Sequence, residues 1–175
     1  MVKKILLSLL ALVVIFLGYV ATRPDTFRIT RSVVVAAPPS EVYPRLADFR
    51  RWEAWSPWAR LDPTMKVDYL GKQGEPGAGY TWKGNDKVGE GRMTVVSADP
   101  DRSLTIKLEF IKPWAATNTT VFDLAPDAGG TKVTWTMTGD HDFVGKLFAV
   151  FVNMDKVVGG DFEKGLAQLK GSQPK

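Results

Sequence analysis

Residues 104–139 read LTIKLEFIKPWAATNTTVFDLAPDAGGTKVTWTMTG, and this stretch decides the fold. It contains three runs in which apolar and polar residues alternate, separated by the short segments KPWAA and PDAGG. Alternation with a period of two is typical of strands that bury one face, and short turn-rich connections join antiparallel neighbours. We therefore expect three antiparallel strands here, with one dry face and one wet face.

The same pattern extends upstream. Between Met65 and Asp140 we count six strands, and residues 27–37 (FRITRSVVVAA) add a first strand in which Phe27, Ile29, Arg31, Val33 and Val35 share a face. Glycines 77, 79, 89 and 91 are interpreted as turn or bulge residues because they lie between or within strands. The expected dry face comprises Tyr80, Trp82, Met93, Val95, Leu104, Ile106, Leu108, Phe110, Phe122, Leu124, Val133, Trp135 and Met137.

Two short helices are expected after the first strand, one capped by Ser40 and one in the following bend. Residues 143–169 carry apolar residues every three or four positions, which predicts one long amphipathic helix, with a kink or a close contact with the sheet at Gly159–Gly160. The predicted fold class is α+β: a curved seven-stranded antiparallel sheet wrapped around a long C-terminal helix.

The bend at residues 52–58 holds Trp52, Trp55 and Trp58, half of the six tryptophans in the chain. Each Trp can bury about 150–250 Å², so three of them can fasten a bend onto the edge of a sheet. We interpret the cluster as closing one end of the core. The alternative is that Trp55 or Trp58 forms part of a cavity mouth.

The composition of the chain excludes several kinds of functional site. The chain has 175 residues, a formal net charge of +4 and no cysteine, so disulfides, thiolate metal sites and cysteine nucleophiles are excluded. Basic residues are interspersed with acidic ones, which argues against nucleic-acid binding. With one histidine in the chain, neither a metal site nor a cofactor site is expected. Nothing in the sequence indicates an oligomeric state.

Residues 5–21 form an uncharged run preceded by Lys3 and Lys4. As a helix this run extends about 26 Å, which is enough to cross a bilayer as a single-pass anchor. A cleaved signal peptide is the alternative, but bulky Tyr19 stands where a small residue would precede a cut after Ala21. We expect an anchor over 1–24, a folded domain over 25–171 and a frayed tail over 172–175. Lys3 and Lys4 favour a cytoplasmic N-terminus and an extracytoplasmic domain, whereas arginines 23, 28 and 31 favour the reverse.

The order of these elements over residues 26–170 resembles the SRPBCC superfamily, the START-like helix-grip proteins that include polyketide-cyclase-type members. The likeness is carried by VVAAPPSEVYPRLADFRRWEAWSPW (34–58), GKQGEPGAGYTWKG (71–84), VTWTMTG (133–139) and DFEKGLAQLK (161–170), which together are similar to bacterial members with an N-terminal membrane segment. The resemblance implies an apolar cavity between the sheet and the long helix, used for lipids, sterols, polyketides and other hydrophobic molecules. It does not imply one reaction.

The expected cavity combines dry-face residues with the bend and the C-terminal helix. Its candidate lining is Trp55, Trp58, Tyr80, Trp82, Met93, Leu108, Phe110, Phe122, Trp135, Met137, Phe151, Met154, Asp155 and Val158. Asp155 is the best carboxylate candidate for acid–base chemistry, although it can equally begin a solvated stripe with Lys156.

No catalytic residue is assigned from the sequence. His141 stands between Asp140 and Asp142 at the start of the predicted helix, which helix capping explains without catalysis. Three functions remain open: a membrane-anchored domain that binds a lipid or another hydrophobic small molecule, an enzyme of cyclase or hydrolase type using Tyr80, Asn118 or Asp155, and a protein interaction module. The first is favoured because apolar residues dominate the expected cavity.

Overall fold

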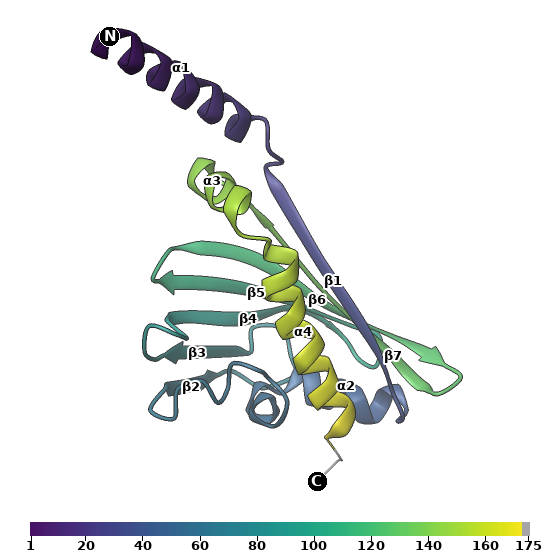
Figure 1. Cartoon of the computed structure of the whole chain (residues 1–175). Coiled ribbons are helices and arrows are strands. Elements are labelled where there is room, and N and C mark those ends of the chain that lie inside the picture. Colours follow the sequence, from purple (N-terminus) through teal and green to yellow (C-terminus); the bar gives the residue numbers. More distant parts are fainter. Residues whose placement is uncertain (173–175) are drawn as a thin grey trace.

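A seven-stranded, fully antiparallel sheet forms the body of the protein in the computed structural model, which describes residues 1–172 (Figure 1). Its spatial order is β1-β7-β6-β5-β4-β3-β2. The first strand therefore pairs with the last, and β1 and β2 form the two edges of the sheet. The strands are β1 (Thr26–Val35), β2 (Lys66–Leu70), β3 (Gly79–Lys83), β4 (Glu90–Asp99), β5 (Ser103–Lys112), β6 (Ala116–Asp127) and β7 (Gly130–Asp140). The predicted sheet is confirmed.

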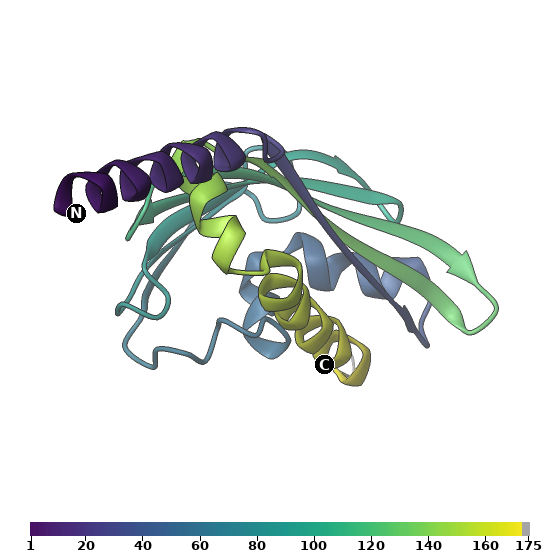
Figure 2. The same ribbon diagram turned by 45° about the horizontal axis from the view of Figure 1, so that its top comes forward.

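The helices are α1 (Val2–Ala21), α2 (Pro39–Ala47), the 3-10 helix η1 (Phe49–Ala54), α3 (Phe143–Phe151) and α4 (Met154–Gly171). Figure 2 shows α2 and α4 beneath the arch of the sheet, on its concave face. The two short helices after β1 are therefore confirmed. However, α2 begins at Pro39 with Pro38 as its N-cap and no side-chain cap bond, so Ser40 lies within the first turn and does not cap it.

The C-terminal segment is two helices, where the sequence predicted one. Val152 is extended, with φ −117° and ψ 120°, and ends α3. The side chain of Asn153 then accepts a hydrogen bond from the Lys156 backbone N–H (3.0 Å), which starts α4 afresh. Gly159 and Gly160 lie within α4 without interrupting it.

The tail predicted over 172–175 begins at a residue that is held in place. The Ser172 carbonyl oxygen accepts a hydrogen bond from Arg45 Nη1 (2.5 Å), and its hydroxyl donates to the Leu169 carbonyl (2.8 Å). Residues 173–175 lie outside the described residues.

Helix α1 stands apart from the sheet, and almost all of its surface is exposed. It is long and apolar enough to cross a membrane, a property that signal sequences share. Four residues, 22–25, connect it to β1.

The core occupies one part of the concave face. Residues directly opposite each other on antiparallel strands point to the same side, so the register defines rows across the sheet. One row joins Leu104, Phe122, Trp135 and Arg31, and the next joins Val95, Ile106, Thr120, Met137 and Ile29. Apart from Arg31, every residue in these two rows is buried. The expected alternation of dry and wet positions holds there.

The tryptophan bend closes this part of the core. Trp52 Nε1 donates to the Leu46 carbonyl (2.8 Å) and Trp55 Nε1 donates to the Arg45 carbonyl (3.1 Å), so both buried indoles are paired with backbone oxygens of α2. Trp58 is half-buried, with its ring edge-on to Trp135 and Phe162. The interpretation that the bend closes one end of the core is confirmed.

Candidate functional site

The concave face has two halves that differ in how well they are covered. We call the closed half the packed set of Val95, Leu104, Ile106, Phe122, Leu124, Val133 and Trp135, with Trp55 from the bend and Phe162, Leu166 and Leu169 from α4, all of them buried. We call the open half the set of Tyr80, Trp82, Met93, Leu108, Phe110 and Asn118, which form the next two rows of the sheet. Within the open half Tyr80, Met93, Leu108 and Phe110 are all half-buried.

The change in cover follows from the path of α4. This helix packs mainly along β1, and its Phe162 ring stacks on Trp135 in the closed half, with centroids 3.9 Å apart and planes 6° apart. Toward its N-terminus α4 packs Met154 and Val158 against the core, and both are only half-buried. The far end of the concave face is therefore apolar and incompletely covered.

Aromatic rings form one wall of the open half. The Trp82 ring stacks on Tyr80 and stands edge-on to Phe110, both at 5.9 Å, and its Nε1 donates to the Val88 carbonyl (2.9 Å). Gly91 lies opposite Trp82 at a bulge in β4, where a Cβ atom would meet the Trp82 ring at 2.4 Å. The glycine is required for this close approach, in keeping with its interpretation as a bulge residue.

The polar groups that face this wall are neutral. Asn118 and Thr120 are buried on β6, and the carboxamide oxygen of Asn118 fills the space beside Gly139, where a Cβ would lie 2.1 Å from it. Burial raises the pKa of the Tyr80 phenol to about 12, so it remains a protonated hydrogen-bond donor at neutral pH.

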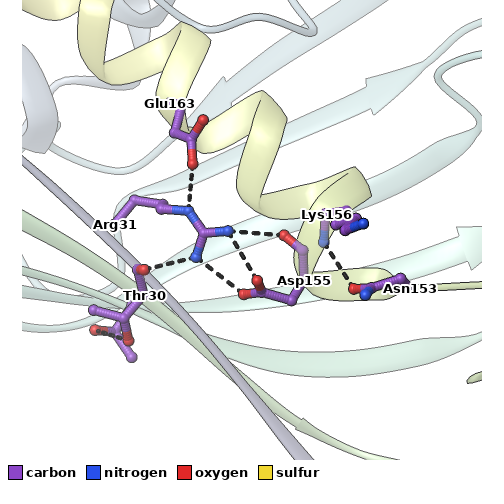
Figure 3. A network of polar contacts seen from close by, with 7 residues as sticks. Thr30, Arg31, Asn153, Asp155, Lys156 and Glu163 are labelled. Carbon is purple, nitrogen blue, oxygen red and sulfur yellow. Dashed lines mark hydrogen bonds and ion pairs between the residues drawn. The ribbon is translucent and has the colours of Figure 1, made fainter.

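An ion-pair network joins Arg31 of β1 to Asp155 and Glu163 of α4 (Figure 3). Together with Gly159 we call these residues the β1–α4 seam, which borders the closed half because Arg31 pairs with Trp135. Arg31 Nη1 and Nη2 donate to the two carboxylate oxygens of Asp155 (3.0 Å each), and Nε donates to Glu163 Oε1 (2.6 Å). These hydrogen bonds lower the pKa of Asp155 and raise the pKa of Arg31. The guanidinium lies against Gly159, where a Cβ would be 2.2 Å from Nη2.

Arg31 is not among the candidate site residues that the sequence predicts. The signal was present: a charged residue occupies an inward position of the first strand, between Ile29 and Val33. Its partners lie 124 and 132 positions away, so the sequence pattern could not identify them.

The candidate lining residues are divided between the two halves. Trp55, Phe122 and Trp135 lie in the closed half, Met137 is buried beside it, and Trp58 lies at its edge. The open half brings together Tyr80, Trp82, Met93, Leu108 and Phe110, and Met154 and Val158 of α4 pack half-buried against the core.

Two candidates lie elsewhere. Phe151 is 73% exposed at the end of α3, with its ring 6.0 Å from that of Phe16 in α1, because the helix break at Val152 directs α3 toward α1. The Asp155 side chain is 59% exposed and the neighbouring Lys156 is also exposed, which agrees with the solvated stripe that was the alternative to a cavity carboxylate. Within that stripe Asp155 is bound to Arg31 of the seam.

His141 lies in a structural junction. Asp142 caps α3 by accepting a hydrogen bond from the Gly145 N–H (2.7 Å), and the His141 ring packs against Phe27 with centroids 5.0 Å apart. Within residues 1–172, no group of three or more His, Cys, Asp or Glu side chains is arranged to hold a metal ion.

Comparisons with solved structures agree with this fold. Similar structures include a Staphylococcus aureus protein of unknown function (TM-score 0.65, 9% identity, covering 84% of this chain and 93% of that one) and a Thermobifida fusca protein (0.62, 24%, 82% and 90%). The di-domain ARO/CYC StfQ from the steffimycin biosynthetic pathway also matches (0.64, 13%), over 83% of this chain and 50% of its own length. At these identities the likeness shows the fold alone.

Family membership comes from the sequence. No curated protein matches the chain. The family model described as polyketide cyclase/dehydrase and lipid transport matches residues 26–172, from the start of β1 to the end of the described chain. The chain belongs to the polyketide cyclase/dehydrase and lipid transport family, within the SRPBCC superfamily.

Proposed function

We propose that this protein is a membrane-tethered binding protein that holds a lipid or another hydrophobic small molecule against the open half of its concave face. The observation that carries the proposal is the row Tyr80, Met93 and Leu108, which continues the buried core yet is only half-covered. Apolar surface left uncovered beside a packed core is typical of ligand sites.

A ligand bound at the open half would gain a substantial free energy from burial of apolar surface. At about 25 cal/mol per Å², a ligand that removes roughly 200 Å² of apolar surface from water gains about 5 kcal/mol before the costs of association. Half-buried Met93 and Met154 suit this role because thioether side chains adapt to ligands of different shape.

The charge distribution favours a ligand without net charge. Arg31, which occupies an inward position of β1, is bound by two carboxylates in the β1–α4 seam. The polar groups at the open half are the amide of Asn118, the hydroxyl of Thr120 and the protonated phenol of Tyr80. A long apolar body with one uncharged polar end fits these groups, and the family description names both polyketides and lipid transport.

Helix α1 is the proposed tether. It is apolar over its length, it is exposed, and Lys3 and Lys4 at its start favour a cytoplasmic N-terminus. The folded domain then lies on the extracytoplasmic side.

The test is native mass spectrometry of the full chain extracted from membranes. The wild-type protein is expected to carry an apolar molecule, and Leu108→Trp, which fills the open half, should lose it. Val96→Trp is the matched control, because Val96 is an exposed residue of β4 outside the open half.

Two results would contradict the proposal. One is a wild-type protein that carries no ligand and gains no thermal stability from any member of a lipid panel. The other is equal ligand retention by Leu108→Trp and Val96→Trp when both variants unfold cooperatively.

A further inference from the structure

One end of the sheet carries an apolar surface that the binding proposal does not use. Its exposed residues, here called the apolar end, are Ile111, Trp114, Phe143, Val144, Phe148 and Phe151. They belong to α3, to the end of β5 and to the β5–β6 connection. The register places these segments together, because Phe110 pairs with Ala116, and Asn118 pairs with Gly139 shortly before α3. Clusters of exposed large apolar residues mark interaction surfaces.

The apolar end lies beside α1. The α3 residue Lys146 forms an ion pair with Asp25 in the connection between α1 and β1, and its Nζ is 3.4 Å from the Ala21 carbonyl oxygen. Phe151 contacts Phe16, and Val20 is the one α1 residue that is fully buried. Helix α3 is therefore attached to the last turns of α1.

The contact between α3 and α1 determines how deep α3 would lie in a bilayer that α1 crosses. Phe16 precedes the end of α1 by five residues, which at 1.5 Å per residue is about 7.5 Å along the helix. Apolar surfaces of interfacial helices enter a bilayer by about 5–10 Å. In addition, a connection of four residues reaches at most about 14 Å, so this end of the sheet stays close to the bilayer that holds α1.

We propose that α3 and the Trp114 loop lie in the interface of the lipid bilayer that α1 crosses, so that the open half opens onto the membrane. The inference rests on the tether of the proposed function. Phe and Trp side chains are suited to the boundary between headgroups and acyl chains. A bilayer is the occupant that the chain itself implies, since the apolar end is continuous with the contact between α3 and α1.

The arrangement gives the ligand a dry route. Phe110 of the open half lies at the end of β5 that leads into the Trp114 loop, where it pairs with Ala116 of β6. An apolar molecule can then pass between the leaflet and the open half without crossing water, which avoids the cost of hydrating its apolar surface.

Site-directed labelling of the full chain tests this inference, and the absence of cysteine makes it direct. Single variants Phe148→Cys and Trp114→Cys carry an environment-sensitive dye in phosphatidylcholine vesicles whose acyl chains bear a quencher. Val96→Cys is the control, because Val96 is 57% exposed and Phe148 55%. Leu9→Cys, within α1, reports the tether itself.

Labels at Phe148 and Trp114 should show a blue-shifted emission and strong quenching, as at Leu9, while the label at Val96 shows neither. If Leu9 is quenched and Phe148 and Trp114 match Val96, the inference fails and the tether stands. If Leu9 is unquenched, the tether and the inference fail together. If Phe148→Cys perturbs the fold, a label at Val144→Cys repeats the measurement on α3. Ligand retention, measured by mass spectrometry, shows separately whether the proposed ligand binding fails.

Discussion

The closed half and the open half of the concave face are built on the same strands and differ in what covers them. In β5, Leu104 and Ile106 are fully buried, while Leu108 and Phe110, two and four residues further along, are only half-buried. The strand pattern does not change between them. What changes is the segment that covers them. Leu104 and Ile106 belong to the core cluster that α2, η1 and the C-terminal part of α4 complete, whereas the break before α4 leaves Leu108 and Phe110 accessible. One alternating strand can thus supply both a buried core and a half-covered apolar face.

The largest expected effect lies in the closed half. Trp135→Ala should lower the free energy of unfolding by about 3–5 kcal/mol, because it leaves a cavity among Phe122, Phe162 and Trp55. Denaturant titration measures this. Trp135→Phe should lower the free energy of unfolding by less than Trp55→Phe, since the buried Trp135 Nε1 has no hydrogen-bond partner within residues 1–172 and Trp55 Nε1 donates to the Arg45 carbonyl. Equal losses of unfolding free energy for Trp135→Phe and Trp55→Phe would contradict this assignment of indole hydrogen bonds.

The corresponding substitution in the open half should lower the free energy of unfolding by less. Leu108→Ala is expected to cost about 1–2 kcal/mol, below the usual range for a buried leucine, because its side chain is already half-exposed. Its main effect should be on ligand retention. Ile106→Ala, one inward position earlier on β5, is the control. Comparable stability losses for the two variants would remove the distinction between the halves.

The β1–α4 seam offers a matched pair of glycines. Gly160→Ala meets no atom within 4 Å and should raise the free energy of unfolding by about 0.5–1 kcal/mol through helix propensity. Gly159→Ala should lose that gain or destabilise the protein, because its Cβ displaces the Arg31 guanidinium. Thermal denaturation of both variants gives the difference. A stabilised Gly159→Ala would show that the seam does not hold α4 in place.

The smallest effect concerns the convex side behind the open half. Hydrogen bonds from Arg92 and Lys107 lower the pKa of Glu109 to about 2 from an ordinary value of 4.5. The carboxylate therefore stabilises the fold fully above pH 4.5, and this contribution is lost as the pH falls toward 2. Glu109→Gln should flatten the decrease in Tm over that interval, and an unchanged pH profile would argue against the pairing.

Much of the fold could be predicted because it depends on local periodicity. The seven strands follow from period-two alternation between turn residues, and the burial of Ile106 or Val133 follows from their phase. The helix break could not be predicted, because apolar Val152 continues the helical spacing and Asn153 acts as a cap only through its own backbone conformation.

The candidate site was harder to predict because it depends on long-range packing. Periodicity grouped Leu104 with Leu108, yet only the course of α4 separates them. For Asp155, local sequence offered either a cavity carboxylate or a solvated stripe, and its exposed side chain agrees with the stripe. Its pairing with Arg31 could not be predicted, because that residue comes from a strand more than a hundred residues earlier. Phe151 fits the spacing of α4 but belongs to a helix that points elsewhere.

With α1 as the proposed tether, the four-residue connection between α1 and β1 would also limit where the proposed ligand could be delivered. With α1 in a bilayer, a reach of about 14 Å is short compared with a cell-envelope compartment. Such a protein cannot shuttle cargo from one membrane to another. Any acceptor must diffuse to it within the same leaflet, so transfer would follow two-dimensional encounter rates, and lengthening the connection would be the way to extend its range.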